Sequence, residues 1–279
     1  MKENIAICFY GLTRSLKYTY KSIKKKIIDP LENNDYQITI YLHTYDLKIL
    51  TNDRSDEKEC LLDINEYKLL NPNIYKITNQ NDFDKMIDIN KYVAHGDPWD
   101  GQEKKSHESL KNILRQWNSL QEVTQLCESS SFKHKCIIYL RPDLFYINKI
   151  NLENISLCLK SRQDKPLVFI PGWAGYGGNN DRFAYGNSSA MKIYGNRIQN
   201  AAQFSLNRSL HSEQFLKYVL RKNKVSVKNI AMYAVRIRAD GHAQRKDKKD
   251  IRKHCSDQDD YDNIINWFEK CIRKGKTEL

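Results

Sequence analysis

Cys136-Ile-Ile-Tyr-Leu-Arg-Pro-Asp143 is the stretch of sequence that decides the fold class. Its first five residues form a short apolar run with β-branched side chains, which is typical of a buried strand in a parallel sheet. Proline cannot donate to a sheet ladder, so we expect the strand to end there and to deliver Asp143 to the carboxyl edge of the sheet. Open α/β sheets bind their ligands at that edge. An ordinary strand end that turns through Pro-Asp is the alternative interpretation.

Strand-like and helix-like segments alternate along most of the chain. Apolar runs predict further strands over 4–10, 37–42, 73–78, 167–171, 181–186 and 233–238. Helical periodicity predicts a helix that ends near 28, before Asp29-Pro30, and helices over 82–89, 106–126, 188–197, 211–221 and 264–272. The stretch 92–105 has the glycines and proline of a surface loop. This order predicts one α/β domain with a mostly parallel sheet flanked by helices.

Composition limits the class of protein. A chain of 279 residues, 40% of them hydrophobic, can bury a full core. No apolar run approaches the ~20 residues that span a bilayer, and no signal peptide precedes the first strand, so we expect a soluble, cytoplasmic protein. The seven scattered cysteines form no C-x-x-C pair, which favours a reducing compartment without disulfides or structural zinc. The net charge of +12 favours anionic partners, although a lysine-rich codon bias produces the same charge without function.

An ordered set of six pieces resembles one enzyme class. The set is similar to small GT-A-type, nucleotide-sugar-dependent glycosyltransferases like those of large DNA viruses and bacterial surface-polysaccharide loci. In that class a D-x-D signature ends the fourth strand, whereas Arg141-Pro-Asp143 stands here without the first acid. The matching pieces are Phe9-Tyr-Gly-Leu-Thr-Arg14, His43-Thr-Tyr-Asp46, Arg115-Gln-Trp117, Tyr139-Leu-Arg-Pro-Asp143, Asn180-Asp-Arg-Phe-Ala-Tyr-Gly186 and His211-Ser-Glu-Gln-Phe-Leu216.

The resemblance implies a fold and an activity. The fold is GT-A (Rossmann-like), with a mixed, mostly parallel sheet in a single domain over 1–279. Residues 1–145 would form its nucleotide-binding half, and residues 146–279 its acceptor half with a C-terminal helix. The activity is transfer of a hexose, or a pentose such as xylose, from a nucleotide diphosphate donor to a hydroxyl of a glycan or glycoprotein acceptor. A UDP-sugar is the default donor, and an inverting outcome is favoured. A homodimer is left open.

Donor-binding candidates lie after the first two strands. Gly11, Thr13 and Arg14 lie where a strand gives way to a helix, and backbone there can approach a phosphate. An ordinary turn with a solvated arginine, and Thr13 as a helix cap, are the alternatives. Asp46 comes after the second strand and could receive ribose or base hydroxyls, or be an exposed loop aspartate.

Two further donor candidates lie on the predicted long helix, and two more lie just past the decisive strand. Arg115 and Gln116 could point toward the nucleotide, while Trp117 beside them suits core packing. Arg141 could neutralise a diphosphate, and Asp143 could hold a divalent cation, because phosphate oxygens and water complete such a site.

A metal site would need a second ligand besides Asp143. His242 is the candidate, and its imidazole favours Mn²⁺ over Mg²⁺; a loop histidine is the alternative. Without a metal, Arg141, Arg238 and the basic run 245–253 could stabilise the leaving diphosphate.

Catalytic and sugar-binding candidates lie in the second half. Asp181 and Glu213 compete for the catalytic role of general base in an inverting transfer. The resemblance favours Glu213, which lies in a first helical turn where similar enzymes place their base, and it implies that Asp181 hydrogen-bonds the donor sugar. A first-turn glutamate that merely complements the helix dipole is the alternative for Glu213. Trp173 and Tyr176, in a glycine-rich loop, could stack on a sugar face, or Trp173 could anchor the loop to the core.

Two other functions compete with sugar transfer. A sugar-phosphate nucleotidyltransferase would use a similar sheet, but the first strand lacks the glycine-rich, basic loop of those enzymes. A nucleic-acid-binding protein would use the positive charge, but the basic runs lack interleaved aromatic residues, so we expect no nucleic-acid partner.

Overall fold

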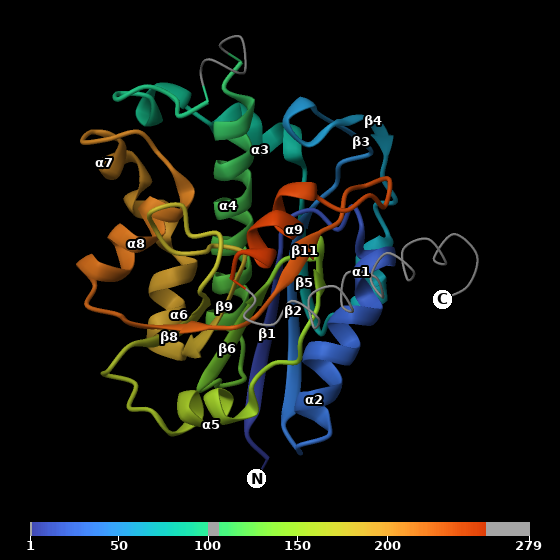
Figure 1. The fold of residues 1–279 in the computed structure, drawn as a ribbon, viewed down its shortest axis with the longest axis vertical. Coiled ribbons are helices and arrows are strands. Elements are labelled where there is room, and N and C mark those ends of the chain that lie inside the picture. The colour runs from blue at the N-terminus through green and yellow to red at the C-terminus, as the bar shows by residue number, and fades with distance from the viewer. Residues whose placement is uncertain (1, 100–105, 255–279) are drawn as a thin grey trace.

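The computed structural model describes residues 2–99 and 106–254, and its centre is a seven-stranded sheet (Figure 1). The strand order is β10-β8-β9-β6-β1-β2-β5. β9 is antiparallel to both of its neighbours, and every other pairing in the sheet is parallel. These strands are β1 (Asn4–Tyr10), β2 (Gln37–Tyr45), β5 (Ile74–Thr78), β6 (Cys136–Leu140), β8 (Leu167–Pro171), β9 (Phe183–Asn187) and β10 (Ser226–Ile230).

Two short strand pairs lie outside the central sheet. β3 (Ile49–Asn52) and β4 (Glu57–Leu61) form an antiparallel hairpin. β7 (Leu144–Tyr146) pairs with β11 (Ala234–Arg236), which brings a segment from late in the chain beside the segment that carries Asp143.

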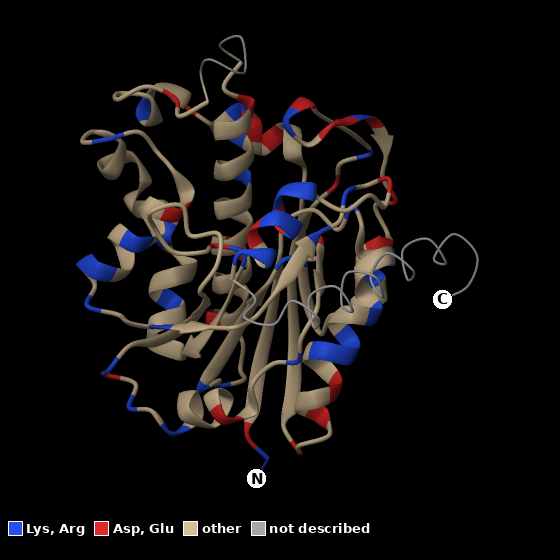
Figure 2. Cartoon of the chain, viewed as in Figure 1, with Lys and Arg blue, Asp and Glu red and all other residues tan. Residues whose placement is uncertain are grey.

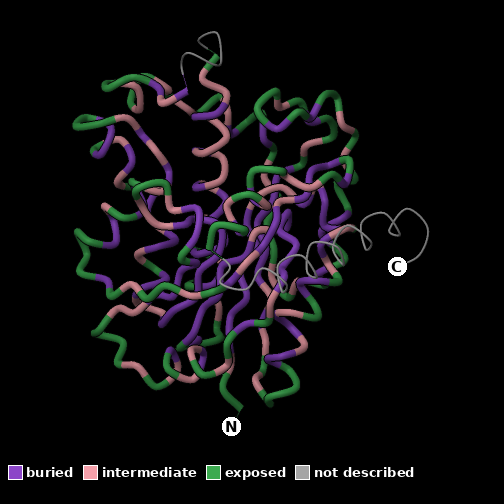
Figure 3. Tube along the Cα trace, viewed as in Figure 1, coloured by how far each residue is buried: buried purple, intermediate pink, exposed green. Residues whose placement is uncertain are grey.

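Helices cover both faces of the sheet, and the alternation of side chains along β1 shows how. Ile5, Ile7 and Phe9 pack toward α1 (Leu16–Ile23), α2 (Asp29–Glu32) and α5 (Leu152–Lys160). Ala6, Cys8 and Tyr10 pack toward the helices of the opposite face, which are α4 (Glu108–Ser129), α6 (Ser188–Gly195) and α8 (Ser212–Lys222). Because successive strand residues point to opposite faces, one buried strand contributes to two cores, and the strands form the buried centre of Figure 3.

The remaining helices lie around the sheet. They are α3 (Gln80–Met86), α7 (Ala201–Ser205) and α9 (Arg245–Arg252), with 3₁₀ turns at Asp53–Ser55, Glu66–Leu70, Ile89–Tyr92 and Arg197–Asn200.

The predicted α/β architecture with a mostly parallel sheet is confirmed. The predicted end of the first helix is wrong, because a π-helical segment, Lys24–Ile28, leads directly into α2. Pro30 lies in the first turn of α2, where a backbone N–H is not needed, so the helix passes through it. The helix predicted over 264–272 lies outside the described residues. The sequence patterns did not predict β3, β4, β7, β10, α5, α7 and α9. They predicted a strand at β11 but not its pairing with β7.

The five described cysteines are free. Within the described part of the chain, no helix is both long and apolar enough to cross a membrane.

Candidate active site

A cleft of about 700 Å³ opens at the carboxyl edge of the sheet. The chain passes from β1 to β2 and β5 on one side and later places β6 on the other side of β1. The order therefore reverses between β1 and β6, and open α/β sheets bind ligands outside the carboxyl ends of such a pair of strands. Tyr10 and Gly11 line the cleft from the end of β1, and Arg141 and Asp143 line it from the end of β6.

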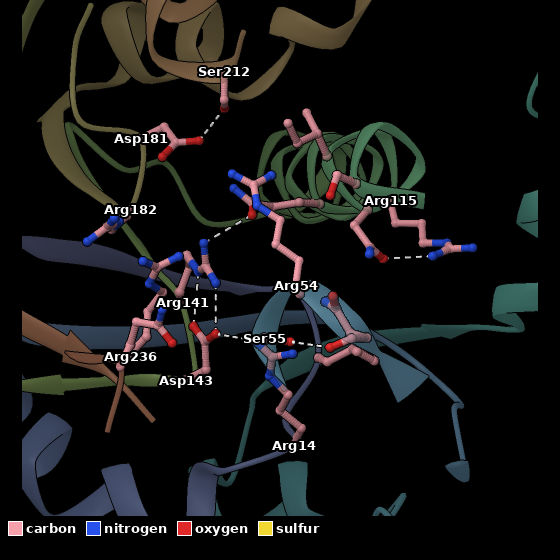
Figure 4. Close-up of a pocket in the computed structure, with 18 of the residues that line it drawn as sticks. Arg14, Arg54, Ser55, Arg115, Arg141, Asp143, Asp181, Arg182, Ser212 and Arg236 are labelled. Atoms are coloured by element: carbon pink, nitrogen blue, oxygen red, sulfur yellow. Dashed lines mark hydrogen bonds and ion pairs between the residues drawn. The ribbon is translucent and has the colours of Figure 1, made fainter. Parts of the chain in front are cut away.

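Asp143 lies on the floor of the cleft between two arginines (Figure 4). Its carboxylate accepts from Arg14 Nη2 at 2.9 Å, and from Arg141 Nε at 3.0 Å and Nη2 at 2.7 Å. Burial alone would raise the pKa of Asp143, but Arg141 and Arg14 hold this pKa well below its usual range. Asp143 is therefore an ionised carboxylate whose oxygens are already engaged.

The β3–β4 hairpin supplies a second carboxylate, Glu57, which is buried beside the cleft and pairs with Arg14 of the cleft lining. Glu57 Oε2 accepts from Arg14 Nη1 at 2.9 Å, and Glu57 Oε1 accepts from the backbone N–H of Ala239 at 2.9 Å. Ser55 of the hairpin also donates to Glu57. The hairpin is thus fastened both to the segment after β1 and to the segment after β11.

A third carboxylate comes from α9. Asp247 is fully buried and accepts from Arg182 Nη1 at 2.8 Å and from Arg236 Nε and Nη2 at 2.8 and 2.7 Å. Arg182 also lies over the Trp173 ring at 5.1 Å. α9 therefore holds two arginines of the cleft wall in place.

The cleft has an excess of positive charge. Arg238 has only a long ion pair among the described residues: its Nη1 is 4.0 Å from Glu57 Oε2, and its Nε and Nη2 donate to Gln244 at 3.3 and 3.0 Å. Burial, with repulsion from Arg14 and Arg236, lowers the pKa of Arg238 to about 9. We call this set the arginine network; it contains five guanidinium groups and three carboxylates, namely Arg14, Arg141, Arg182, Arg236 and Arg238 with Glu57, Asp143 and Asp247.

These residues do not fit a divalent cation. The carboxylate of Asp143 is covered by guanidinium groups, and His242 is not among the residues that line the cleft. The His242 ring instead contacts Asp240 at 2.6 Å. Among residues 2–99 and 106–254, no group of three or more His, Cys, Asp and Glu side chains is placed to hold a metal. The predicted metal pair of Asp143 and His242 is not formed.

Glu213 lies on the opposite wall, at the start of α8. It exposes 13% of its side chain. Burial first, and the Asp181 carboxylate second, raise the pKa of Glu213 to about 7, with Arg182 and Arg236 acting against them. His211 Nδ1 lies 3.3 Å from the Glu213 carboxylate, and burial lowers the pKa of this histidine, so its ring is neutral.

Asp181 differs from Glu213 although both acids line the cleft. Ser212 donates to its carboxylate, so this hydroxyl binds Asp181 and does not cap α8. Burial would raise the pKa of Asp181, but Arg197 and the Ser212 hydrogen bond lower it. The two neighbouring acids therefore have pKa values pushed in opposite directions, which is the pattern of an acid–base site.

The cleft contains several further residues that the sequence predicted. Gly11 has φ of +95°, which requires glycine, and its N–H donates to Ser119 Oγ at 2.8 Å. Gln116 accepts from Arg141 Nη1 at 3.1 Å. Arg115 is bound by Asp84, Glu108 and Asn112, so its guanidinium is already engaged. Tyr176 lies under Lys246, which is 4.3 Å from its ring.

Three predicted residues, besides His242, lie outside the cleft lining. Trp173 is 2% exposed and donates its indole N–H to Met232 O at 2.7 Å, so its predicted sugar-stacking role is wrong and it anchors the loop. Thr13 is buried. Asp46 is exposed and accepts from Asn79 Nδ2 at 3.1 Å.

The cleft also contains residues that sequence patterns missed. Arg54 and Trp99 lie together at its rim, with the guanidinium carbon 4.5 Å from the ring centroid, and Trp99 stacks on His211 at 6.1 Å. Asp247 does not line the cleft itself but holds Arg182 and Arg236 of its wall, and it comes from a helix that sequence patterns did not distinguish within a basic run. The sequence could have indicated Arg182, because it directly follows the candidate Asp181. No sequence pattern indicates Arg54 and Trp99, because only tertiary folding brings them to the cleft.

Comparisons with known proteins are weak. No protein-family model and no curated protein matches the chain. The solved structures similar to it include mouse xyloside xylosyltransferase 1 in its apo form, at 10% identity and a TM-score of 0.42, which covers 82% of this chain and 85% of that chain. They also include the galactosyltransferase LgtC in complex with donor and acceptor sugar analogs, at 13% identity and a TM-score of 0.39, covering 81% and 73% of the two chains. An active-site mutant of LgtC has 13% identity, a TM-score of 0.40 and coverage of 81% and 72%.

Proposed function

We propose that this protein is a GT-A-type glycosyltransferase that moves a sugar from a nucleoside diphosphate donor to a hydroxyl of a glycan acceptor. One observation carries the proposal: an arginine-rich cleft, with an acid of raised pKa on its far wall, lies at the point where the strand order reverses. That position suits a nucleotide, and the excess positive charge suits its diphosphate. A UDP-sugar, carrying a hexose or xylose, is the donor we propose first.

The arginine network would bind and release the diphosphate. In an inverting transfer the acceptor oxygen attacks the anomeric carbon, the bond from that carbon to the diphosphate oxygen breaks, and the bonding electrons leave with the nucleoside diphosphate. Arg238 has the least compensated charge in the network and would stabilise this leaving group. Asp143 would act by positioning Arg14 and Arg141, which it holds at 2.9 and 2.7 Å.

Glu213 would be the general base. With a pKa of about 7, its carboxylate is basic enough to take the proton of the attacking hydroxyl and is still ionised in a substantial fraction near neutral pH. Asp181, with its lowered pKa, is the weaker base and would accept hydrogen bonds from hydroxyls of the donor sugar.

Calorimetric titration with UDP, GDP, CDP and ADP, each with and without Mn²⁺, tests the donor site. We expect one diphosphate to bind without the metal, and Arg238→Gln to weaken it. Arg162→Gln is the matched control, because Arg162 is exposed and pairs only locally with Asp164. If no nucleoside diphosphate binds at millimolar concentration, the proposal fails.

A further inference from the structure

A second pocket, of about 510 Å³, lies on the outer side of α8. Its lining contains four cationic side chains and no acidic one. Figure 2 shows blue segments on α8, which Figure 1 labels, and no residue of the arginine network lines this pocket. We call it the α8 pocket; it is lined by Gly177, Arg208, Gln214, Lys217, Tyr218, Arg221 and Lys222.

The cations of the α8 pocket differ from those of the cleft. No described carboxylate forms an ion pair with any of the four, whereas four of the five arginines of the network touch a carboxylate closely. Lys217 Nζ lies 3.3 Å from Gly177 O, and Lys222 Nζ lies 3.1 Å from Asn200 Oδ1. Lys217 and Arg221 are four residues apart on one helix, where like charges destabilise the helix. Arg221 and Lys222 lie in the last turn of α8, where their charge complements the helix dipole. Lys217 lies a turn earlier, so its charge serves neither an ion pair with a described carboxylate nor the helix end.

The α8 pocket shares a wall with the cleft. Tyr176 and Glu213 line the cleft. The residue that follows each of them in the sequence, Gly177 and Gln214 respectively, lines the α8 pocket. The wall is tightly packed, because a Cβ on Gly178 would lie 1.9 Å from Glu213 O. The two openings are therefore neighbours, and an acceptor long enough to reach from Glu213 past this wall would meet the α8 pocket.

The chemistry of the lining points to an acidic sugar chain. Tyr218 is half-buried: its ring packs against Phe204, with 5.1 Å between the ring centroids, and Lys222 Nζ lies 5.9 Å from its centre. The ring therefore helps to place Lys222 at the pocket. Arg208 and Arg221 can pair with carboxylates through two N–H groups each. A concave pocket suits an oligosaccharide better than the broad surface of a membrane.

We infer that the α8 pocket binds the acidic part of the acceptor, a glycan that carries hexuronate carboxylates. This inference rests on the proposed glycosyltransferase function. It adds a requirement that the cleft does not impose, namely negative charge on the acceptor several atoms away from the reacting hydroxyl.

Calorimetry on the full chain with tetragalacturonic acid tests the inference, and its methyl ester, which has the same sugars without the charge, is the ligand control. We expect the acid to bind, and the ester to bind at least about tenfold more weakly. The double variant Lys217→Gln/Arg221→Gln should lose affinity for the acid to the same extent. The matched variant Lys133→Gln/Lys160→Gln, which removes two exposed charges elsewhere, should keep it.

Three results would overturn the inference: equal binding of acid and ester, equal loss in both double variants, or binding of phosphatidylserine vesicles that depends on Lys217 and Arg221 when the acid does not bind. UDP binding, measured in the same samples, separates the two proposals. If UDP binds and the acid does not, only the α8 pocket assignment fails. If the acid binds and no nucleotide does, the glycosyltransferase proposal fails.

Discussion

Replacing Glu213 by glutamine should make the protein more stable at alkaline pH while it destroys activity. The ordinary pKa of a glutamate is 4.5, and burial with the Asp181 charge raises that of Glu213 to about 7. The folded protein therefore binds more protons than the unfolded chain between these two pH values, and its stability falls as the pH rises through that window. At 1.36 kcal/mol for each pH unit, the ionised Glu213 costs at most about 3 kcal/mol above pH 7.

Urea unfolding of the wild type and Glu213→Gln at pH 4.5 and at pH 8 measures this cost. We expect the two proteins to be nearly equal at pH 4.5, and the variant to be more stable at pH 8 by up to about 3 kcal/mol. Glu153→Gln is the matched control, because Glu153 also lies in the first turn of a helix but is exposed. The Glu153→Gln variant should be less stable than the wild type at pH 8 by a few tenths of a kcal/mol, because it removes a negative charge that complements the helix dipole. This change in the free energy of unfolding has the opposite sign to that expected for Glu213→Gln.

A Glu213→Gln protein that is no more stable than the wild type at pH 8 would refute the reasoning, since the carboxylate would then be as well solvated as in the unfolded chain. Activity gives an independent readout. The kcat/KM of the wild type should rise about tenfold per pH unit below pH 7 and level off above it, and the variant should lose about 10² to 10⁴-fold.

Three other changes probe the arginines and the loop anchor. Arg238→Gln should weaken diphosphate binding by about tenfold or more without lowering the unfolding temperature, because burial and its arginine neighbours already disfavour this charge; a large drop in unfolding temperature would contradict this. Asp143→Asn should destabilise the free protein by about 3 kcal/mol or more, because the buried guanidinium groups lose their partner, and added pyrophosphate should restore part of that in a thermal unfolding scan; no restoration would show that the cleft does not bind the anion. Trp173→Ala should cost about 3–5 kcal/mol in urea unfolding yet leave nucleotide affinity intact at low temperature, whereas selective loss of sugar binding would return Trp173 to the site.

Several parts of the site could be predicted from the sequence for local reasons. The apolar run before Arg141-Pro-Asp143 identified a buried strand, and a parallel strand places the residues just beyond its end at the ligand edge. Gly11 was identified in the same way, as the residue after the first strand. Glu213 was proposed from the resemblance, because similar enzymes place their base in such a first helical turn. Its raised pKa could not be predicted, because burial and the neighbouring Asp181 act through space.

The same limit explains why the predicted pair of Asp143 and His242 does not come together. Aspartate and histidine side chains commonly bind metals, and both residues lie in segments where a ligand was expected. Which atoms the Asp143 carboxylate and the His242 ring contact, however, depends on tertiary packing. The β3–β4 hairpin and the β7–β11 pair bring Glu57 and Arg238 toward Arg14, although they come from segments far apart in the sequence. A sheet hairpin between loops leaves no periodic signal that predicts its position.

The sequence by itself determined the α/β class, the order of the central strands' apolar runs and the edge at which a ligand would bind. These features depend on the period of side chains along one segment, which local chemistry sets. Only the tertiary structure decided that the carboxylate of Asp143 is bound by two arginines, that Trp173 is an anchor, and that α8 separates an arginine-rich cleft from a second cationic pocket. Those outcomes depend on charge, burial and distance between segments, and no single segment carries that information.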